Sequence, residues 1–392
     1  MIECTRCGRV DGIKRAGFVR GQQRYFCREC RYYFVLEKQA PAPRQRQTTI
    51  VDIARYLGVS PSTVSKALSG RQDISPRTRE EIRRVANELQ YQPNLLAQGL
   101  TSSKTFTIGV VIPNIERPFF ASIVSGIQQV VTPAGYRVMI CQSNESHPTE
   151  VANVQALVAS RVEGMLICHS IETETFDHIR RPFGNGMPIV HFDRVCEETE
   201  TAKVIQDDFG GAFAITEHLI RQGCRRIAIL AGPEKLLISR RRLAGYQAAL
   251  EKHGLFSGET LICHSDFRPE TARTALDRWE KNRPDAIFCI HYGNAIDLLL
   301  ALRERDIRVP EDIALTGFGD ELLTALIEPG LTTIQPYPFQ IGQKAARLLL
   351  EQIHHPESFV PETHVLKGDL IIRGSSGKPS SGKPTSGKRL SP

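Results

Sequence analysis

The chain has 392 residues, of which 41% are hydrophobic and 24% charged, and its formal net charge is +7. This length predicts two to four folded units. No apolar run reaches the roughly 18 residues that a membrane-spanning helix needs. The N-terminus also lacks the apolar stretch of a secretory signal, so we expect a cytoplasmic protein without a membrane partner.

The charge is unevenly distributed along the chain. Residues 1–47 hold 11 basic and four acidic side chains, whereas residues 101–372 are acidic overall. A basic end joined to an acidic body indicates a polyanion-binding part and a module with another task. A single charge run is more often a solvated face, so the motifs have to decide.

The first segment, 1–36, contains two C-x2-C pairs with 19 residues between them, formed by Cys4, Cys7, Cys27 and Cys30. Four thiolates at this spacing are typical of a closed tetrahedral zinc site. So short a segment with few large apolar side chains needs a metal or disulfides to fold. We therefore predict structural Zn²⁺, in preference to redox or disulfide pairing. The other six cysteines stand singly, and we expect them to behave as small buried hydrophobes.

The pattern CxxCG…GQQRYFCRECRYYF in this segment resembles the zinc ribbon of certain insertion-sequence transposases. Its arginines alternate with aromatic residues, as on many nucleic-acid-binding surfaces. The preferred interpretation is an additional DNA contact. Docking of a protein and support of a dimer are the alternatives.

Residues 48–93, which follow a polar linker at 37–47, have the pattern of a helix-turn-helix headpiece. Thr49 and Asp52 form a capping box for a first helix, and Ser60 caps a second helix after a tight turn. The second helix has a small polar face that fits the major groove, with a plain helical hairpin as the alternative. The predicted DNA-contacting residues here are Ser60, Ser62, Thr63, Ser65 and Lys66.

Residues 105–372 alternate apolar strands with amphipathic helices, which indicates parallel sheets with right-handed crossovers. Strands are predicted at 107–113, 137–142, 164–169, 188–193, 226–232, 260–266, 286–291 and 313–319. So many strands favour two doubly wound lobes, with a ligand cleft at the carboxyl ends of the strands. Residues 373–392 are basic, repeat a short S-G-K-P-like unit, and are predicted to be disordered.

Residues 48–372 as a whole resemble the lactose-repressor (LacI/GalR) family. The matching stretches follow the family's order: TIVDIARYLGVSPSTVSKALSG, YQPNLLAQGL, TIGVVIPN, the DD of VIQDDFG, AGPEKLLISRRRLAGY, VPEDIALTGFGDE and EPGLTTI. The resemblance implies a multidomain protein with an all-α headpiece, a hinge helix and a two-lobed α/β module like a periplasmic binding protein. It also implies a homodimer on double-stranded operator DNA, and no terminal heptad repeat suggests a tetramer.

The family's hinge helix corresponds to residues 94–104. The resemblance implies that it folds only on operator DNA, where Leu100 is wedged into a minor-groove step and Ala97 lies against the groove. Such a wedge partly unstacks a base step and kinks the duplex, and further contacts offset the cost. An ordinary linker helix, with Leu100 packed on the partner chain, is the alternative.

The resemblance further implies effector-binding residues. Phe119 and Phe120 match the pair that lines the cleft from the first lobe. Asp193 matches a carboxylate that approaches sugar hydroxyls, and Arg240 matches the arginine that grips the ligand from the second lobe. The rigid fork of an arginine suits bidentate contacts to hydroxyls or to a carboxylate.

Two departures from the family alter the expected effector. His291 and Tyr292 stand where the family commonly has Asn-Asp, and Gly319 stands where it commonly has Asp. A free pentose or hexose is therefore disfavoured relative to a phosphorylated, aromatic or larger metabolite, with His291 and Arg240 toward an anion. Loss of effector binding and plain strand-end packing of the aromatic pair are the alternatives.

Together these patterns predict a sequence-specific DNA-binding transcriptional regulator, in the first place a repressor, whose operator affinity is controlled by a small ligand. An uptake or chemosensing protein shares the two-lobed fold but needs an export signal. A transposase-like enzyme needs an acidic metal triad, which does not stand out. No enzyme activity is predicted.

Overall fold

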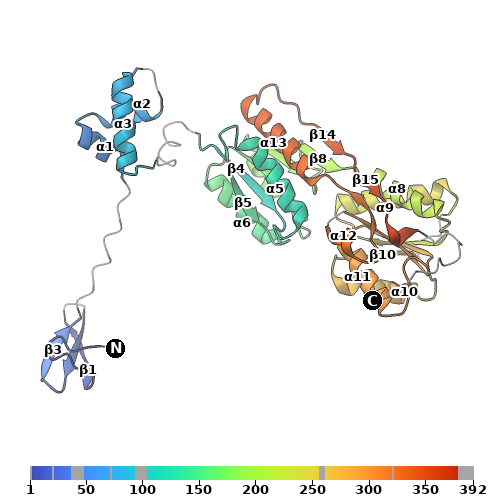
Figure 1. Cartoon of the computed structure of the whole chain (residues 1–392), viewed down its shortest axis with the longest axis horizontal. Helices are drawn as coiled ribbons and strands as arrows, with labels where there is room; N and C mark the ends of the chain where they lie inside the picture. Colours follow the sequence, from blue (N-terminus) through green and yellow to red (C-terminus); the bar gives the residue numbers. More distant parts are fainter. Residues whose placement is uncertain are drawn as a thin grey trace, which may run out of the picture. The chain divides into compact units, whose positions relative to one another are not determined.

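The structure is a computed structural model that describes residues 2–19, 22–36, 48–70, 73–92, 104–255, 261–319 and 322–377. The expected linker, the hinge residues Ala97 and Leu100, and residues 378–392 lie outside this description. The chain divides into two compact units, Met1–Gln98 and Gly99–Pro392 (Figure 1). None of the described helices is long and apolar enough to cross a bilayer.

The first unit begins with a small antiparallel sheet. Its strands, in spatial order, are β1 (Ile13–Val19), β2 (Gln22–Cys27) and β3 (Tyr32–Val35). The buried members of its apolar cluster are Cys4, Cys27 and Phe34. A core of this size cannot by itself offset the entropy lost when the chain is ordered. The sheet therefore needs a cross-link, and its cysteines are the residues that can supply one.

The first unit continues with a bundle of three helices, α1 (Ile50–Leu57), α2 (Pro61–Leu68) and α3 (Pro76–Glu88). The predicted capping box is present, because the backbone N–H of Thr49 donates to the Asp52 carboxylate at 2.8 Å. Gly58 ends α1 in the left-handed conformation. Ser60 caps α2 by accepting a hydrogen bond from the backbone N–H of Thr63 at 3.0 Å. The core of the bundle consists of Ile53, Ala54, Val64, Ala67, Ile82, Val85 and Ala86.

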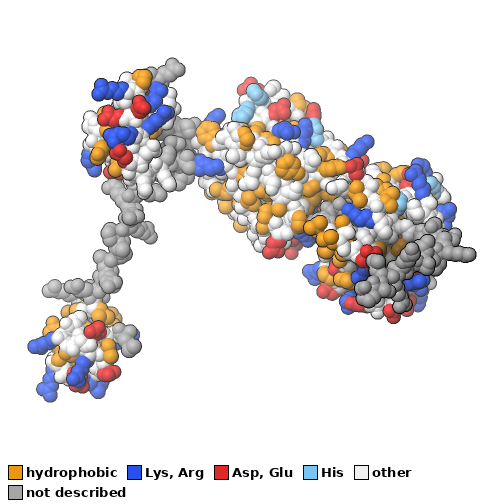
Figure 2. Space-filling model, viewed as in Figure 1, with side chains coloured by type: hydrophobic (Ala, Val, Ile, Leu, Met, Phe, Trp, Pro, Cys, Tyr) orange, Lys and Arg blue, Asp and Glu red, His pale blue; other side chains and the backbone are white. Residues whose placement is uncertain are grey.

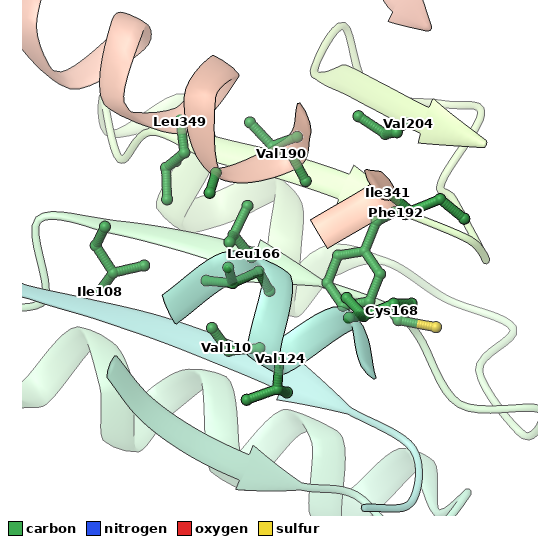
Figure 3. Packing of buried hydrophobic residues seen from close by; sticks show 14 of the residues in the cluster. Ile108, Val110, Val124, Leu166, Cys168, Val190, Phe192, Val204, Ile341 and Leu349 are labelled. Carbon is green, nitrogen blue, oxygen red and sulfur yellow. The ribbon is translucent and has the colours of Figure 1, made fainter. Parts of the chain in front are cut away.

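The second unit has two lobes, each with a six-stranded sheet. The sheet of the first lobe has the order β14-β8-β7-β6-β4-β5 and is parallel throughout. Its strands are β4 (Thr107–Ile112), β5 (Arg137–Gln142), β6 (Gly164–Ile167), β7 (Ile189–Phe192), β8 (Ala202–Gln206) and β14 (Thr363–Leu366). Its helices are α5 (Pro118–Val131), α6 (His147–Ala159), α7 (Asp177–Gly184) and α13 (Pro338–His354). Apolar side chains of the strands pack against α5 and α13, as Figure 3 shows for Val110, Leu166 and Leu349.

The sheet of the second lobe has the order β10-β9-β11-β12-β13-β15, parallel except that β15 runs antiparallel to β13. Its strands are β9 (Ile227–Ala231), β10 (Ile262–His264), β11 (Ala286–Cys289), β12 (Ala314–Phe318), β13 (Thr332–Gln335) and β15 (Asp369–Ile371). Its helices are α8 (Asp208–Arg221), α9 (Leu237–Lys252), α10 (Pro269–Trp279), α11 (Tyr292–Arg303) and α12 (Leu322–Leu326). All eight predicted strands are present in the two sheets. Because the chain crosses between lobes after β8, after β13 and after β14, three segments connect them.

The prediction that disorder begins at residue 373 is wrong for the first residues of the tail. Arg373 is followed by a short 3₁₀ turn, η2 (Gly374–Ser376), in which Ser375 and Ser376 are fully buried. The Ser375 hydroxyl donates to the backbone carbonyl of Leu315 at 2.6 Å. A composition of small polar residues indicates disorder, but here buried hydrogen bonds hold those residues in place.

Candidate functional site

Four cysteine thiols meet beside the small sheet of the first unit. Cys4 and Cys7 precede β1, Cys27 ends β2, and Cys30 lies in the turn before β3. Their sulfur atoms all lie within 4.8 Å of one another, at 3.6 Å for Cys4–Cys30 and 3.7 Å for Cys7–Cys27. All four thiols are free. A tetrahedral zinc ion with bonds of about 2.3 Å would hold its sulfur ligands about 3.8 Å apart. The four cysteines therefore form a possible metal site.

The predicted DNA-contacting residues of the headpiece share one helix. On α2, Ser62 and Ser65 are exposed and Thr63 is half-buried, whereas Val64 between them faces the core. The Lys66 ammonium lies 2.7 Å from the Asp73 carboxylate, and both side chains are close to half exposed. An exposed pair of this kind contributes little and opens readily. A polar face on α2 is thus available to a polyanion.

A cavity of about 600 Å³ lies between the two lobes of the second unit. Most of its wall is apolar, and its aromatic members are Phe119, Phe120, Phe267, Tyr292 and Phe318. Three leucines of α12 add to the apolar wall. The wall also contains charged, amide and imidazole side chains: Arg117, Asp193, Arg194, Gln206, Arg242 and His291. Ligand sites have this composition, in which an apolar wall holds a few polar groups that fix orientation.

Five of the six predicted effector residues line this cavity, namely Phe119, Phe120, Asp193, His291 and Tyr292. Asp193 directly follows β7 and has a φ of 58°, in the left-handed region. Aspartate tolerates this conformation better than most residues do. The sharp turn places a carboxylate at the carboxyl end of a parallel strand, where ligands of this fold class bind.

The sixth prediction, Arg240, needs a correction. Its guanidinium pairs with Glu197 at 2.5 Å, both side chains are about half exposed, and Arg240 does not line the cavity. Arg242, two residues further along α9, lies about 200° around the helix and does line it. Arg242 bonds to the buried Asp208 at 2.8 Å and to the backbone carbonyl of Ile290 at 2.6 Å. Three consecutive arginines made the register ambiguous in the sequence, and helix geometry selects the last of them.

The two departures from the family's cleft residues, Tyr292 and Gly319, depend on each other in the structure. Gly319 has a φ of 101°, and a Cβ added to it would lie 3.0 Å from the ring of Tyr292. The aromatic ring thus takes the space that a side chain at position 319 needs. A carboxylate at 319 would have to displace Tyr292, and its backbone would be strained as well.

His291 is a neutral group in this site. Burial, together with the positive charges of Arg117, Arg242 and Arg194, lowers its pKa to about 3. Its Nδ1 accepts a hydrogen bond from the backbone N–H of Gly293 at 3.1 Å, so the proton is on Nε2. With this pKa, His291 would face an anion as a neutral hydrogen-bond donor through Nε2.

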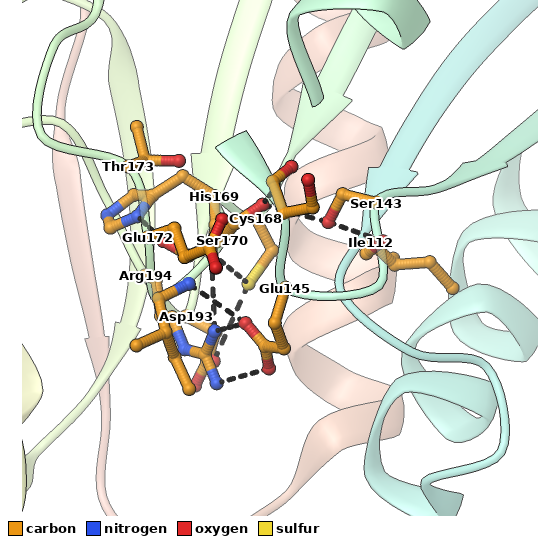
Figure 4. A network of polar contacts seen from close by, with 12 residues as sticks. Ile112, Ser143, Glu145, Cys168, His169, Ser170, Glu172, Thr173, Asp193 and Arg194 are labelled. Carbon is orange, nitrogen blue, oxygen red and sulfur yellow. Dashed lines mark hydrogen bonds and ion pairs between the residues drawn. The ribbon is translucent and has the colours of Figure 1, made fainter. Parts of the chain in front are cut away.

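Among the polar residues of the cavity that sequence reasoning missed are Arg117, Arg194 and Gln206. Arg194 is buried and binds both carboxylate oxygens of Glu145, at 2.6 and 3.1 Å (Figure 4). Gln206 is 3% exposed, and neither of its amide atoms has a partner in the described part of the chain. The neighbouring Asp193 would have pointed to Arg194, but no pattern in the sequence marks Gln206.

Two protein families match the chain. Residues 49–94 match the profile described as "Bacterial regulatory proteins, lacI family". Residues 216–376 match that of a periplasmic binding protein-like domain. The "HTH-type transcriptional repressor CytR" of Escherichia coli (strain K12) is 30% identical over 335 residues, which are 85% of this chain and 97% of that protein.

Two solved structures extend the similarity to the fold. A complex of the transcriptional regulator CelR with cellobiose has 30% sequence identity and a TM-score of 0.63, covering 84% of this chain and 100% of that one. The lac repressor dimer bound to operator and the anti-inducer ONPF has 25% identity and a TM-score of 0.75, covering 85% and 100%. At this coverage, both similarities extend beyond the two lobes into the first unit.

Proposed function

The chain belongs to the lacI family of bacterial regulatory proteins, and on this premise we propose that it is a repressor whose affinity for operator DNA is set by a small ligand between its lobes. One observation carries this: a single chain combines a capped helix-turn-helix with an apolar cavity that holds a few unpaired polar groups. By linkage, the ligand and the operator must change each other's affinity by the same factor.

For DNA contact we propose the polar face of α2. Ser62, Thr63 and Ser65 lie on this face, and Lys66 can exchange Asp73 for a phosphate or a guanine. Ser60 is occupied with capping, so its share is to fix the start of the helix. Leu100 and Ala97, outside the described residues, are proposed to form the minor-groove wedge and its flank.

We also propose that the repressor acts as a homodimer. The lac repressor structure to which it is similar is a dimer on its operator. Strand β5 is at the edge of the first lobe's sheet, and its neighbouring residues Met139 and Ile140 are 39% and 42% exposed. Figure 2 shows hydrophobic side chains gathered over this lobe. An apolar edge of this kind favours pairing with a second copy.

For the effector we propose a planar aromatic metabolite with an acidic group. A sugar needs many hydrogen-bond partners, but two cavity arginines are already engaged, Arg194 by Glu145 and Arg242 by Asp208. The aromatic wall suits a flat ring. Arg117 makes no ion pair within the described chain and can bind an anion. The Gln206 amide, which has no partner among the described residues, can form hydrogen bonds with polar atoms at the edge of a ring.

We propose that the four cysteines bind one structural zinc ion and that the small sheet is a zinc ribbon which adds a DNA contact. The sulfur distances and the minimal core support the metal. The guanidinium groups of Arg6 and Arg24 lie over the rings of Tyr32 and Tyr33, at 5.4 and 4.6 Å from the ring centres. Half of Tyr33 is exposed, so it can stack on a base.

Operator selection from random duplexes tests the proposal, with the full chain compared with a shortened chain that begins at Gln47. Both should enrich a near-palindrome of about 14–20 base pairs, since a dimer reads two half-sites. Flanking bases enriched only by the full chain would assign DNA contact to the ribbon. If neither chain enriches any sequence, the repressor assignment fails.

Matched variants locate the contact on α2. Ser65→Glu places a negative charge on the proposed DNA face, whereas Asn87→Glu places the same charge on the exposed side of α3. We expect Ser65→Glu to weaken operator binding by at least about tenfold and Asn87→Glu to weaken it far less. Equal losses would show that long-range charge, and not contact by α2, governs affinity.

A further inference from the structure

A second cluster of metal-ligating side chains lies in the first lobe, away from the cysteines. It consists of His147 and Glu150, one turn apart on α6, and His178 on α7. One ligand atom from each residue lies within 4.8 Å of the others. The effector and DNA-binding proposals do not use this cluster.

Glu150 is a buried carboxylate held ready for a cation. It is fully buried, and it accepts hydrogen bonds from the backbone N–H and the hydroxyl of Ser170, at 2.5 and 2.6 Å. It also accepts from the Thr173 hydroxyl at 3.1 Å and lies 2.8 Å from Nε2 of His178. Four donors around one buried carboxylate stabilise its ionised form. Its negative charge is fixed inside the lobe, and the imidazole is its one ionisable hydrogen-bond partner in the described chain.

His147, unlike Glu150, is not held by side-chain hydrogen bonds among the described residues. Its Nδ1 is buried without a hydrogen-bond partner among the described residues. Its ring stands at 85° to that of His178, with the ring centres 5.2 Å apart. An unpartnered buried nitrogen costs free energy unless something coordinates it. Two imidazoles and a carboxylate that converge in this way are the donor set that zinc and its neighbours prefer.

We propose that His147, Glu150 and His178 bind a divalent transition-metal ion of the Zn²⁺ class. Metal–ligand bonds of about 2.0–2.2 Å place tetrahedral ligands about 3.4 Å apart, so the His178–Glu150 pair must open slightly. The ion takes the place of the hydrogen between Nε2 of His178 and the Glu150 carboxylate, so that Nε2 coordinates the metal through its lone pair. Three protein ligands leave a fourth position for water.

The site adjoins the wall of the effector cavity. Ser170, which contacts Glu150, is followed by Ile171, whose backbone N–H donates to Glu145 at 2.9 Å. Glu145 in turn holds Arg194 of the cavity wall, as Figure 4 shows for the labelled pair. A metal that shifts Glu150 thus acts on the loop that positions a cavity arginine.

Metal counting on the full-length chain tests this inference. The chain is saturated with Zn²⁺, passed through gel filtration, and its zinc content measured by elemental and native mass spectrometry. We expect two ions per chain, and one in each of His147→Ala and His178→Ala. His147→Ala should also weaken the second zinc at least tenfold in a competition titration. Nδ1 of His147 has no hydrogen-bond partner among the described residues, so we expect this variant to keep the fold.

His355→Ala, which removes an exposed histidine, is the matched control and should keep two ions. Cobalt substitution separates the two sites, because only the cysteine site gives a thiolate charge-transfer band. That band should persist in His147→Ala while one cobalt is lost. A wild-type chain with one ion and the thiolate band overturns the inference. So does a second ion that survives both histidine variants. If the cysteine site is empty, a single cobalt without that band, lost in His147→Ala, supports it.

Discussion

The two units place their functional side chains in different ways. In the first unit, the proposed DNA-contacting face belongs to one eight-residue helix, and the four cysteines come from two C-x2-C segments. In the second unit, the cavity draws residues from both lobes, from Phe119 on α5 to Gly319 after β12. Residue spacing in the sequence determines the geometry of a site that lies on one helix or strand. It does not determine the geometry of a site that depends on how several elements pack together.

The same difference extends to what stabilises each unit. In the first unit, the small sheet has a minimal core beside its four cysteines, and the three helices combine a small core with local caps. The lobes rely on buried pairs and close contacts between distant segments. A Cβ on Gly342 of α13, for example, would lie 2.1 Å from the backbone carbonyl oxygen of Ile123 on α5.

Removing the zinc ion proposed for the cysteine site should have the largest effect. We expect a chelator to unfold residues 2–36 completely, because structural zinc contributes about 10 kcal/mol or more to such small domains. Hydrogen exchange would show loss of protection in β1–β3 and none in α1–α3. Cys27→Ser should reproduce this loss, and Cys141→Ser, at a half-buried single cysteine, should not. Protected sheet amides after complete metal removal would contradict it.

Arg242→Leu should have the next largest effect, because it leaves the carboxylate of Asp208 buried and unpaired. We expect a loss of about 3–5 kcal/mol in the free energy of unfolding. Arg240→Leu removes an exposed pair with Glu197 and should cost about 1 kcal/mol or less. Urea unfolding followed by the fluorescence of Trp279, the single tryptophan, measures both. Similar losses in the two variants would contradict the larger contribution of the buried Arg242–Asp208 pair.

Arg240 and Arg242 show which features of the site could be predicted from the sequence and which could not. Alternating apolar and helical patterns predicted eight strands correctly, and caps such as Ser60 located the helices of the headpiece. The side chain that reaches the cavity depends on the rotation of α9 against its sheet, which spacing does not record. The cluster around Glu150 was missed because His178 is 28 residues away in the sequence, and no pattern in the sequence marks Gln206.

The acid sensitivity of the first lobe should depend on His191. Burial, with the positive charges of His169 and Lys203, lowers its pKa to about 3, so the folded chain keeps it neutral. The unfolded chain binds a proton below about pH 6.5, and stability is therefore lost as the pH falls from about 6.5 toward 3. The slope is at most about 1.4 kcal/mol per pH unit.

Urea titrations at several pH values, followed by circular dichroism, measure this slope. In His191→Gln the slope should become shallower by up to that amount, whatever the variant's absolute stability. His355→Gln, at an exposed site, should leave it unchanged. An unchanged slope in His191→Gln would mean that the acid sensitivity comes from elsewhere in the lobe.

The smallest expected effects distinguish a residue that stabilises α2 from a residue of α2 that contacts DNA. Ser60→Ala removes the hydroxyl that accepts from the backbone N–H of Thr63, so the headpiece should lose about 1 kcal/mol. Ser62→Ala removes an exposed hydroxyl and should leave the unfolding free energy almost unchanged while it weakens operator binding. Headpiece melting and operator titration on both variants give the two readouts. If Ser62→Ala destabilised the headpiece as much as Ser60→Ala, the division of the helix into a cap and a contact face would not hold.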